Sequence, residues 1–192
     1  MIWIKWEYLI TELIYRKLSQ PLAKFLLRFD VNPTSVTYIA TVIGIFAGYL
    51  IAVGKFYESV LVIFVSQILD CADGDLARFS GKVSSKGGYL DRIFDRFVDA
   101  AIVIGIVAVS PEKYWLLGIL AVVGSFGVSI SRAMAEAEGF ECKVGIGGRD
   151  TRLLVIMLGI LLNQLYAILI ILILLGFLTT VHRIIHSVKQ MD

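Results

Sequence analysis

The fold is decided by a stretch that reads Asp70-Cys71-Ala72-Asp73-Gly74-Asp75-Leu76-Ala77-Arg78, then eight residues, then Gly87-Gly88-Tyr89-Leu90-Asp91-Arg92-Ile93-Phe94-Asp95. It holds two spaced pairs of aspartates: Asp70 and Asp73 are three residues apart, and Asp91 and Asp95 are four apart. Each pair therefore lies on one face of its own helix. Long apolar runs flank both pairs, and carboxylates at the mouth of a membrane bundle are costly and usually functional.

Composition places the chain among integral membrane proteins. Of its 192 residues, 58% are hydrophobic, and the mean hydropathy is +0.82. A soluble domain of this length rarely has such a composition. The chain is too short for a membrane domain plus a sizeable soluble one. We therefore expect one all-α membrane domain over residues 1–192, with the lipid bilayer and no nucleic acid as its partner.

The first 31 residues are expected to form an amphipathic helix on the membrane surface, because aromatic, apolar and basic residues interleave there. This helix is predicted to break near Pro21. A breaker at residues 30–33 follows, and Thr34 or Ser35 is predicted to cap the next helix.

A bundle of six transmembrane helices is expected over residues 32–192. The last apolar stretch, residues 153–185, is too long for one span of about 20 residues. We therefore predict a division at Asn163-Gln164, with one long tilted helix as the alternative. The predicted spans are residues 34–54, 56–79, 87–109 and 114–136, followed by one span on each side of Asn163.

The distribution of basic residues predicts the orientation. With six spans, both termini and the loops at residues 80–86 and 137–150 share one side of the membrane. All but two of the 18 Lys and Arg residues lie on that side, the exceptions being Lys55 and Lys113. The positive-inside rule then places both termini and the aspartates in the cytoplasm of a multi-pass cell-membrane protein.

The aspartates indicate a site for a hard cation. Four converging carboxylates repel one another strongly unless a cation lies among them, and such oxygen-rich sites suit Mg²⁺ or Mn²⁺. An ion that binds carboxylates and phosphates together points to phosphoryl transfer. Arg78 can neutralise a phosphate, and Gly74 and Gly87 let the backbone approach a bulky ligand. One carboxylate is left to deprotonate a hydroxyl as general base.

Two further aspartates fall outside this pattern. Asp75 is expected to be solvated or paired with Arg78. Asp99 continues the spacing one turn deeper, and it either pairs with Arg96 or lines the cavity.

The run Asp70-x2-Asp73-Gly74-x2-Ala77-Arg78-x8-Gly87-x3-Asp91-x3-Asp95 resembles the motif of the CDP-alcohol phosphotransferase family, without gap or substitution. The resemblance implies transfer of a substituted phosphoryl group from a CDP-alcohol to an acceptor hydroxyl, with release of CMP. It implies metal ligation by Asp70, Asp73 and Asp91, with Asp95 beside the metal as the catalytic general base. The predicted metal set is thus these four aspartates, holding two Mg²⁺ or Mn²⁺ ions. The implied CDP contacts come from Asp73, Gly74, Ala77, Arg78 and Gly87. The family resemblance also implies a homodimer.

The acceptor is predicted from a second basic cluster. Arg149 and Arg152 lie three residues apart at the start of the fifth span, where backbone N–H groups are unpaired. Together with Arg132 they form a good anion site, which suits an acceptor that is itself phosphorylated. The glycines at residues 145–148 would let the loop fold onto a ligand. The alternative is that these arginines contact lipid headgroups.

Two segments, residues 131–139 and 149–153, resemble the branch of the family that uses inositol phosphate as acceptor. This branch contains the phosphatidyl- and archaetidylinositol phosphate synthases. The resemblance implies that Arg132, Arg149 and Arg152 hold the acceptor phosphate. Residues 15–21 also resemble the first segment of the di-myo-inositol phosphate phosphate synthases, whose donor is CDP-inositol.

The sequence therefore predicts a transferase that joins a CDP-activated lipid, or CDP-inositol, to an inositol phosphate. Glycerol phosphate is the alternative acceptor. A cation transporter or channel is an alternative class, although the aspartates lie at one membrane face and no internal repeat is seen. A catalytically silent membrane scaffold is the third alternative.

Overall fold

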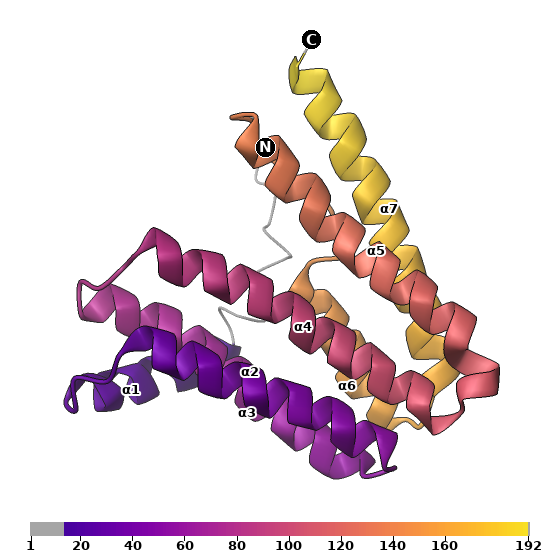
Figure 1. Cartoon of the computed structure of the whole chain (residues 1–192), viewed down its shortest axis with the longest axis horizontal. Helices are drawn as coiled ribbons and strands as arrows, with labels where there is room; N and C mark the ends of the chain where they lie inside the picture. The colour runs from indigo at the N-terminus through magenta and orange to yellow at the C-terminus, as the bar shows by residue number, and fades with distance from the viewer. Residues whose placement is uncertain (1–13, 192) are drawn as a thin grey trace. The chain divides into compact units, whose positions relative to one another are not determined.

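The computed structural model describes residues 14–191, which form seven α-helices and no strand within that range (Figure 1). The helices are α1 (Arg16–Leu27), α2 (Pro33–Ala52), α3 (Phe56–Phe79), α4 (Ser85–Val109), α5 (Pro111–Ala137), α6 (Arg149–Leu161) and α7 (Leu165–Met191). The all-α prediction is confirmed for this part of the chain. The last apolar stretch is divided as predicted, with Asn163 at φ +54° between α6 and α7.

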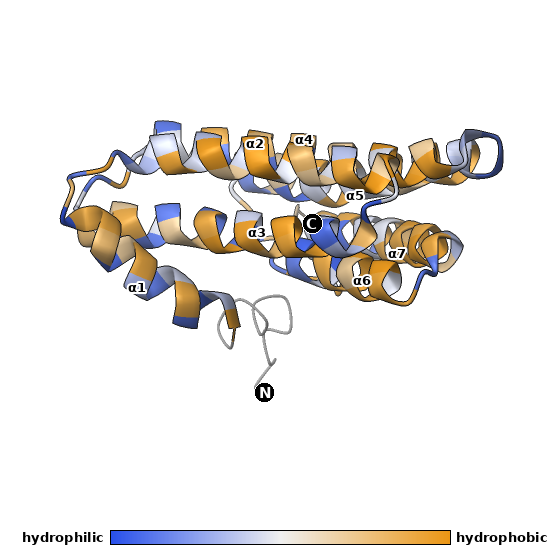
Figure 2. Cartoon of the chain, turned by 90° about the horizontal axis from the view of Figure 1, so that it is seen from below, coloured by the Kyte–Doolittle hydropathy of each residue, from blue (hydrophilic) through white to orange (hydrophobic). Residues whose placement is uncertain are grey.

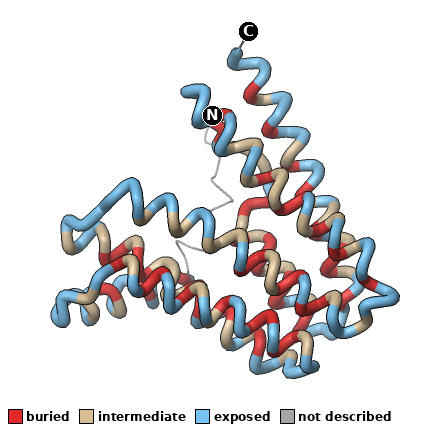
Figure 3. Tube along the Cα trace, in the orientation of Figure 1, coloured by how far each residue is buried: buried red, intermediate tan, exposed pale blue. Residues whose placement is uncertain are grey.

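The described helices fall into two units, α1–α4 and α5–α7. In the first unit, α2 packs against both α3 and α4, and α1 packs against α3. In the second unit, α7 packs against both α5 and α6. Each described helix contains buried residues, and those of α4 begin only at Val98, as the red segments of Figure 3 show. The whole aspartate motif belongs to the first unit, and the three predicted acceptor arginines belong to the second.

Helix α2 begins with a different cap from the predicted one. The side chain of Asn32 accepts a hydrogen bond from the backbone N–H of Thr34 at 2.9 Å, so Asn32 is the N-cap. Pro33 takes the first helical position, where its missing N–H costs nothing and its fixed φ suits the helix. The prediction of Thr34 or Ser35 as the cap was wrong because both residues already lie inside the helix.

Helix α1 is amphipathic and runs through Pro21, so the predicted break was wrong. A proline removes only one backbone hydrogen bond, here to the carbonyl of the exposed Lys17. Ser19 and Ala23 are its buried residues, and hydrophilic and hydrophobic residues both occur along it, as the blue and orange segments of α1 in Figure 2 show. The part of the predicted amphipathic segment before residue 14 lies outside the described residues.

Small residues set the spacing of the first unit. Ala23 of α1, Val36 of α2 and Leu76 of α3 form one buried cluster. Between α2 and α4 the backbones touch: a Cβ atom built on Gly105 would lie 2.2 Å from the carbonyl oxygen of Gly48. No side chain fits at this contact, so the two glycines fix how closely α4 approaches α2.

Three described helices are long and apolar enough to cross a membrane, namely α2, α5 and α7. By the length and composition of its helices, the described part of the chain has three candidate spans, so the prediction of six spans was wrong. Helices α3 and α4 have 24 and 25 residues, but both carry the charges of the aspartate motif. Helix α6 has 13 residues, so it is about 20 Å long against a hydrocarbon core of about 30 Å.

Candidate active site

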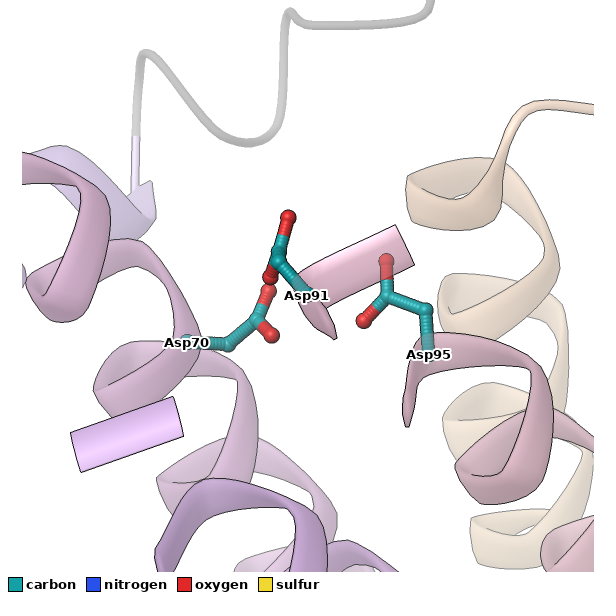
Figure 4. A group of neighbouring side chains, drawn as sticks. All are labelled: Asp70, Asp91 and Asp95. Atoms are coloured by element: carbon teal, nitrogen blue, oxygen red, sulfur yellow. The ribbon is translucent and has the colours of Figure 1, made fainter. Parts of the chain in front are cut away.

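Three of the four motif carboxylates meet between α3 and α4. Asp70 comes from the second half of α3, and Asp91 and Asp95 come from successive turns in the first half of α4. One carboxylate oxygen of each lies within 4.8 Å of the others, and their side chains turn toward a common space (Figure 4). All three are half-buried. The spacing of four residues brings Asp91 and Asp95 to one face of α4, as the sequence predicted, whereas the predicted group of four is a group of three.

Asp73 lies one turn beyond Asp70 and is buried, outside the group of three. Its charge interacts with those of Asp70 and Asp91. Its Oδ2 atom is buried and has no hydrogen-bond partner among the described residues. A buried carboxylate oxygen beside two other carboxylates is strongly unfavourable without a positive partner. The donor set consists of hard oxygen atoms, so these residues fit a divalent ion such as Mg²⁺ or Mn²⁺.

Arg96 connects the motif to Asp99, which the sequence left unassigned. Its guanidinium lies 3.3 Å from the buried carboxylate of Asp99 and 3.6 Å from that of Asp95. Of the two alternatives, pairing with Arg96 is confirmed for Asp99. The pair places a positive charge beside Asp95 and restrains the side chains on this face of α4.

The predicted CDP contacts gather at the end of α3 and the start of α4. Arg78 is half-exposed and pairs with the buried Asp75 at 2.6 Å, so of the two alternatives for Asp75, pairing with Arg78 is confirmed. The Arg78 guanidinium lies over Gly74, since a Cβ atom there would be 3.6 Å from its Nη1. Ala77 and Gly87 are both partly exposed. The assignment of CDP contacts to these residues stays a prediction.

The three predicted acceptor arginines lie on α5 and α6. Helix α6 begins at Arg149, as predicted, with Gly148 as its N-cap. Arg152 is buried and donates a hydrogen bond to the carbonyl oxygen of Gly147 at 2.7 Å. Arg132 forms an ion pair with Glu136, one turn further along α5, at 2.7 Å. This hydrogen bond holds Arg152 within the fold, and its role in acceptor binding stays a prediction.

The glycine-containing loop before α6 is attached to α7, so the predicted freedom of this loop was wrong. The backbone N–H of Gly147 donates to Thr179 at 2.9 Å, and a Cβ atom on Gly147 would lie 2.6 Å from the carbonyl oxygen of Leu175. Arg183 donates to the carbonyl oxygen of Val144 at 2.8 Å. The glycines thus serve close packing.

Thr179 and Arg183 hold the loop before α6 in place, and neither residue was predicted from the sequence to do so. Arg183 is buried and also donates to the carbonyl oxygen of Val128 on α5 at 2.6 Å. A single arginine near the end of a long apolar helix was the available signal, because a buried arginine requires acceptors.

Comparison with known proteins identifies the family. The sequence pattern of the CDP-alcohol phosphatidyltransferases matches residues 31–182. The chain belongs to this family. It is therefore an enzyme, a transferase.

Relatives within the family are named as synthases of archaetidylinositol phosphate or phosphatidylinositol phosphate. The archaetidylinositol phosphate synthase of Pyrococcus horikoshii is 32% identical over 180 residues, which cover 92% of this chain and 95% of that protein. The phosphatidylinositol phosphate synthase of Mycobacterium tuberculosis, solved with CDP-DAG bound, superimposes with a TM-score of 0.81 at 25% identity, covering 90% of this chain and 94% of that one.

The same Mycobacterium tuberculosis enzyme has also been solved in complex with manganese and citrate. That structure has a TM-score of 0.81 at 25% identity and covers 89% of this chain and 88% of that one. Divalent metal use by a CDP-alcohol phosphatidyltransferase accords with the oxygen-donor set found here.

Proposed function

We propose that the chain transfers the substituted phosphoryl group of a CDP-alcohol to a hydroxyl group of an inositol phosphate, with release of CMP. The observation that carries this proposal is the meeting of Asp70, Asp91 and Asp95 from two helices within 4.8 Å. Family membership supplies the donor class, and the inositol phosphate synthases among the relatives support the acceptor.

The metal is assigned to Asp70, Asp73 and Asp91, with Asp95 beside it. A bound Mg²⁺ or Mn²⁺ would offset the negative charge of the diphosphate and of the departing CMP. The buried oxygen of Asp73 that lacks a hydrogen-bond partner supports its place in the set. Two ions are proposed, since four carboxylates carry enough charge for two divalent cations.

Asp95 is assigned as the general base. It accepts the proton of the acceptor hydroxyl, whose oxygen then forms a bond to the phosphorus that carries the donor's alcohol group. The bond between this phosphorus and the oxygen bridging to the cytidine phosphate breaks, and its electron pair leaves with CMP. Arg96 lies 3.6 Å from Asp95, and its positive charge helps to orient the Asp95 carboxylate.

The donor and the acceptor phosphate are assigned to different residues. Asp73, Gly74, Ala77, Arg78 and Gly87 are proposed to contact CDP. Three arginines are proposed to hold the acceptor phosphate by charge-assisted hydrogen bonds, namely Arg132, Arg149 and Arg152.

The enzyme is proposed to be a homodimer in the cell membrane, with the aspartates on the cytoplasmic side. The excess of Lys and Arg at the aspartate ends of α3 and α4 supports this orientation. Labelling of single cysteines in sealed membrane vesicles, at Lys82 and at Lys113, distinguishes the two sides. Light scattering of the detergent-solubilised protein measures its oligomeric state.

The proposed reaction is tested with a panel of substrates. CDP-diacylglycerol, CDP-archaeol and CDP-inositol are each combined with inositol phosphate, inositol, glycerol phosphate and serine, and CMP release is measured with and without Mn²⁺. Metal-dependent CMP release with inositol phosphate is expected. Release with glycerol phosphate instead would reassign the acceptor, and no release with any pair would reject the proposed reaction.

A further inference from the structure

Asp75 occupies a position that the motif leaves open, yet both of its carboxylate oxygens are engaged. Oδ1 accepts a hydrogen bond from the Arg78 guanidinium at 2.6 Å. Oδ2 accepts a hydrogen bond from the hydroxyl group of Ser19 at 2.6 Å. Asp75 is 3% exposed and Ser19 is fully buried. A buried carboxylate with two short partners is held in one orientation.

The two partners of Asp75 differ in kind. Arg78 is a proposed CDP contact, and its side chain is 54% exposed although one end is fixed. A guanidinium has five N–H donors in a rigid planar fork, so the pair with Asp75 leaves donors for a phosphate. Ser19 belongs to α1, the amphipathic helix, and lies 56 residues earlier in the sequence.

We propose that Asp75 is a positioning residue that holds the Arg78 guanidinium ready for the donor's diphosphate. Ser19 fixes Asp75 in turn, so that α1 takes part in donor recognition. This inference rests on the proposed function, which assigns Arg78 to CDP. It goes beyond that function because neither Asp75 nor Ser19 belongs to the family motif matched by this sequence.

The physical basis is preorganisation. A free arginine side chain samples many rotamers, and binding a phosphate would restrict them at a cost in free energy. The pair with Asp75 restricts the side chain before the ligand arrives. The guanidinium also lies over Gly74, where ordinary van der Waals contact is available and no side chain displaces it. Loss of the charge at residue 75 should therefore weaken donor binding without altering the metal site.

The test measures CDP binding to the detergent-solubilised full chain with Mn²⁺ present, by titration calorimetry. Asp75→Asn keeps the shape and a bond to Ser19 but loses the ion pair with Arg78. We expect CDP affinity to fall about tenfold in Asp75→Asn and about threefold in Ser19→Ala, since charged hydrogen bonds contribute more than neutral ones. With CDP-diacylglycerol as donor, the KM for the donor should rise while the KM for inositol phosphate stays unchanged.

A cycle with Arg78→Ala separates positioning from a purely structural role. If Asp75 acts through Arg78, then Asp75→Asn causes no further loss of CDP affinity once Arg78 is alanine. An equal loss in both backgrounds would show that Asp75 only anchors α1 and would overturn the proposal. Unchanged CDP affinity in Asp75→Asn would also overturn it.

The matched control is Asp30→Asn, which removes another aspartate ion pair of the same unit, with Lys82 at 2.6 Å. Its CDP affinity should equal that of the wild type. The wild-type titration distinguishes the two levels of inference: a wild-type chain that binds no CDP contradicts the proposed function itself, whereas normal wild-type binding with an unaffected Asp75→Asn contradicts only the role of Asp75.

Discussion

Replacing Asp91 by asparagine should make the metal-free protein more stable and the metal-bound protein less so. Asp70, Asp91 and Asp95 offer oxygens within 4.8 Å of one another. At an effective dielectric constant of about 20, two unit charges at this distance repel by roughly 3.5 kcal/mol. Asp91→Asn removes one of the three charges and hence two of the three repulsive pairs, while it keeps the size of the side chain.

The gain is smaller than the full Coulomb energy, because carboxylates near the surface rotate apart and take up protons. A gain of at least about 1 kcal/mol is expected in EDTA, which raises the thermal midpoint by roughly 2–4 °C for a chain of this size. Mn²⁺ should raise the midpoint of the wild type, because an ion that binds only the folded state stabilises it. The same ion should raise the midpoint of Asp91→Asn much less.

The assay is thermal unfolding of detergent-solubilised protein, with EDTA and with a Mn²⁺ titration. Asp30→Asn is the control, because its ion pair with Lys82 lies outside the cluster. In Asp30 that pair lowers the pKa of the carboxyl group, first through the hydrogen bond from Lys82 and then through its charge. The control should therefore melt at or slightly below the wild type at neutral pH and keep the full Mn²⁺ effect. If Asp91→Asn in EDTA melts no higher than the wild type and responds normally to Mn²⁺, the reasoning about the cluster is refuted.

Three further outcomes are expected. Asp95→Asn should reduce CMP release by at least about a thousandfold while leaving CDP affinity nearly unchanged; substantial residual turnover would exclude Asp95 as the base. Arg152→Ala should raise the KM for inositol phosphate more than tenfold with little change in the KM for the donor, and parallel changes in both would instead indicate a general loss of structure through the bond to Gly147. Gly105→Ala should lower the thermal midpoint, because its Cβ would lie 2.2 Å from the backbone oxygen of Gly48 and overpacking costs about 1–3 kcal/mol; an unchanged midpoint would mean that α2 and α4 separate without cost.

The helices of the first unit could largely be predicted from sequence. The predicted span 56–79 coincides with α3, because a glycine at φ +78° precedes it and a glycine at φ +67° follows it. The shared face of Asp91 and Asp95 also followed from their spacing, since helix periodicity fixes which side chains share a face. The same reasoning placed Asp73 in the group, and the structure leaves it outside.

What could not be predicted depends on contacts between residues that are far apart in the chain. Nothing local to Ser19 indicates its bond to Asp75. The glycines before α6 suggest mobility when considered alone, and only the position of Thr179 on α7 shows that they allow close packing. The count of spans failed for a different reason: the functional charges that identify α3 and α4 also lower their hydropathy, and α6 is too short by itself.

The contact of Gly48 with Gly105 limits how the sequence of this enzyme can vary. Asp95 lies ten residues before Gly105 on the same helix, a distance of about 15 Å. A substitution at either glycine would push the two backbones apart and tilt α4 as a rigid rod, moving its two aspartates relative to Asp70. We therefore expect exposed positions of α2, such as Val42 and Tyr49, to tolerate many apolar side chains. Positions 48 and 105 should accept no residue larger than glycine, although neither touches a substrate.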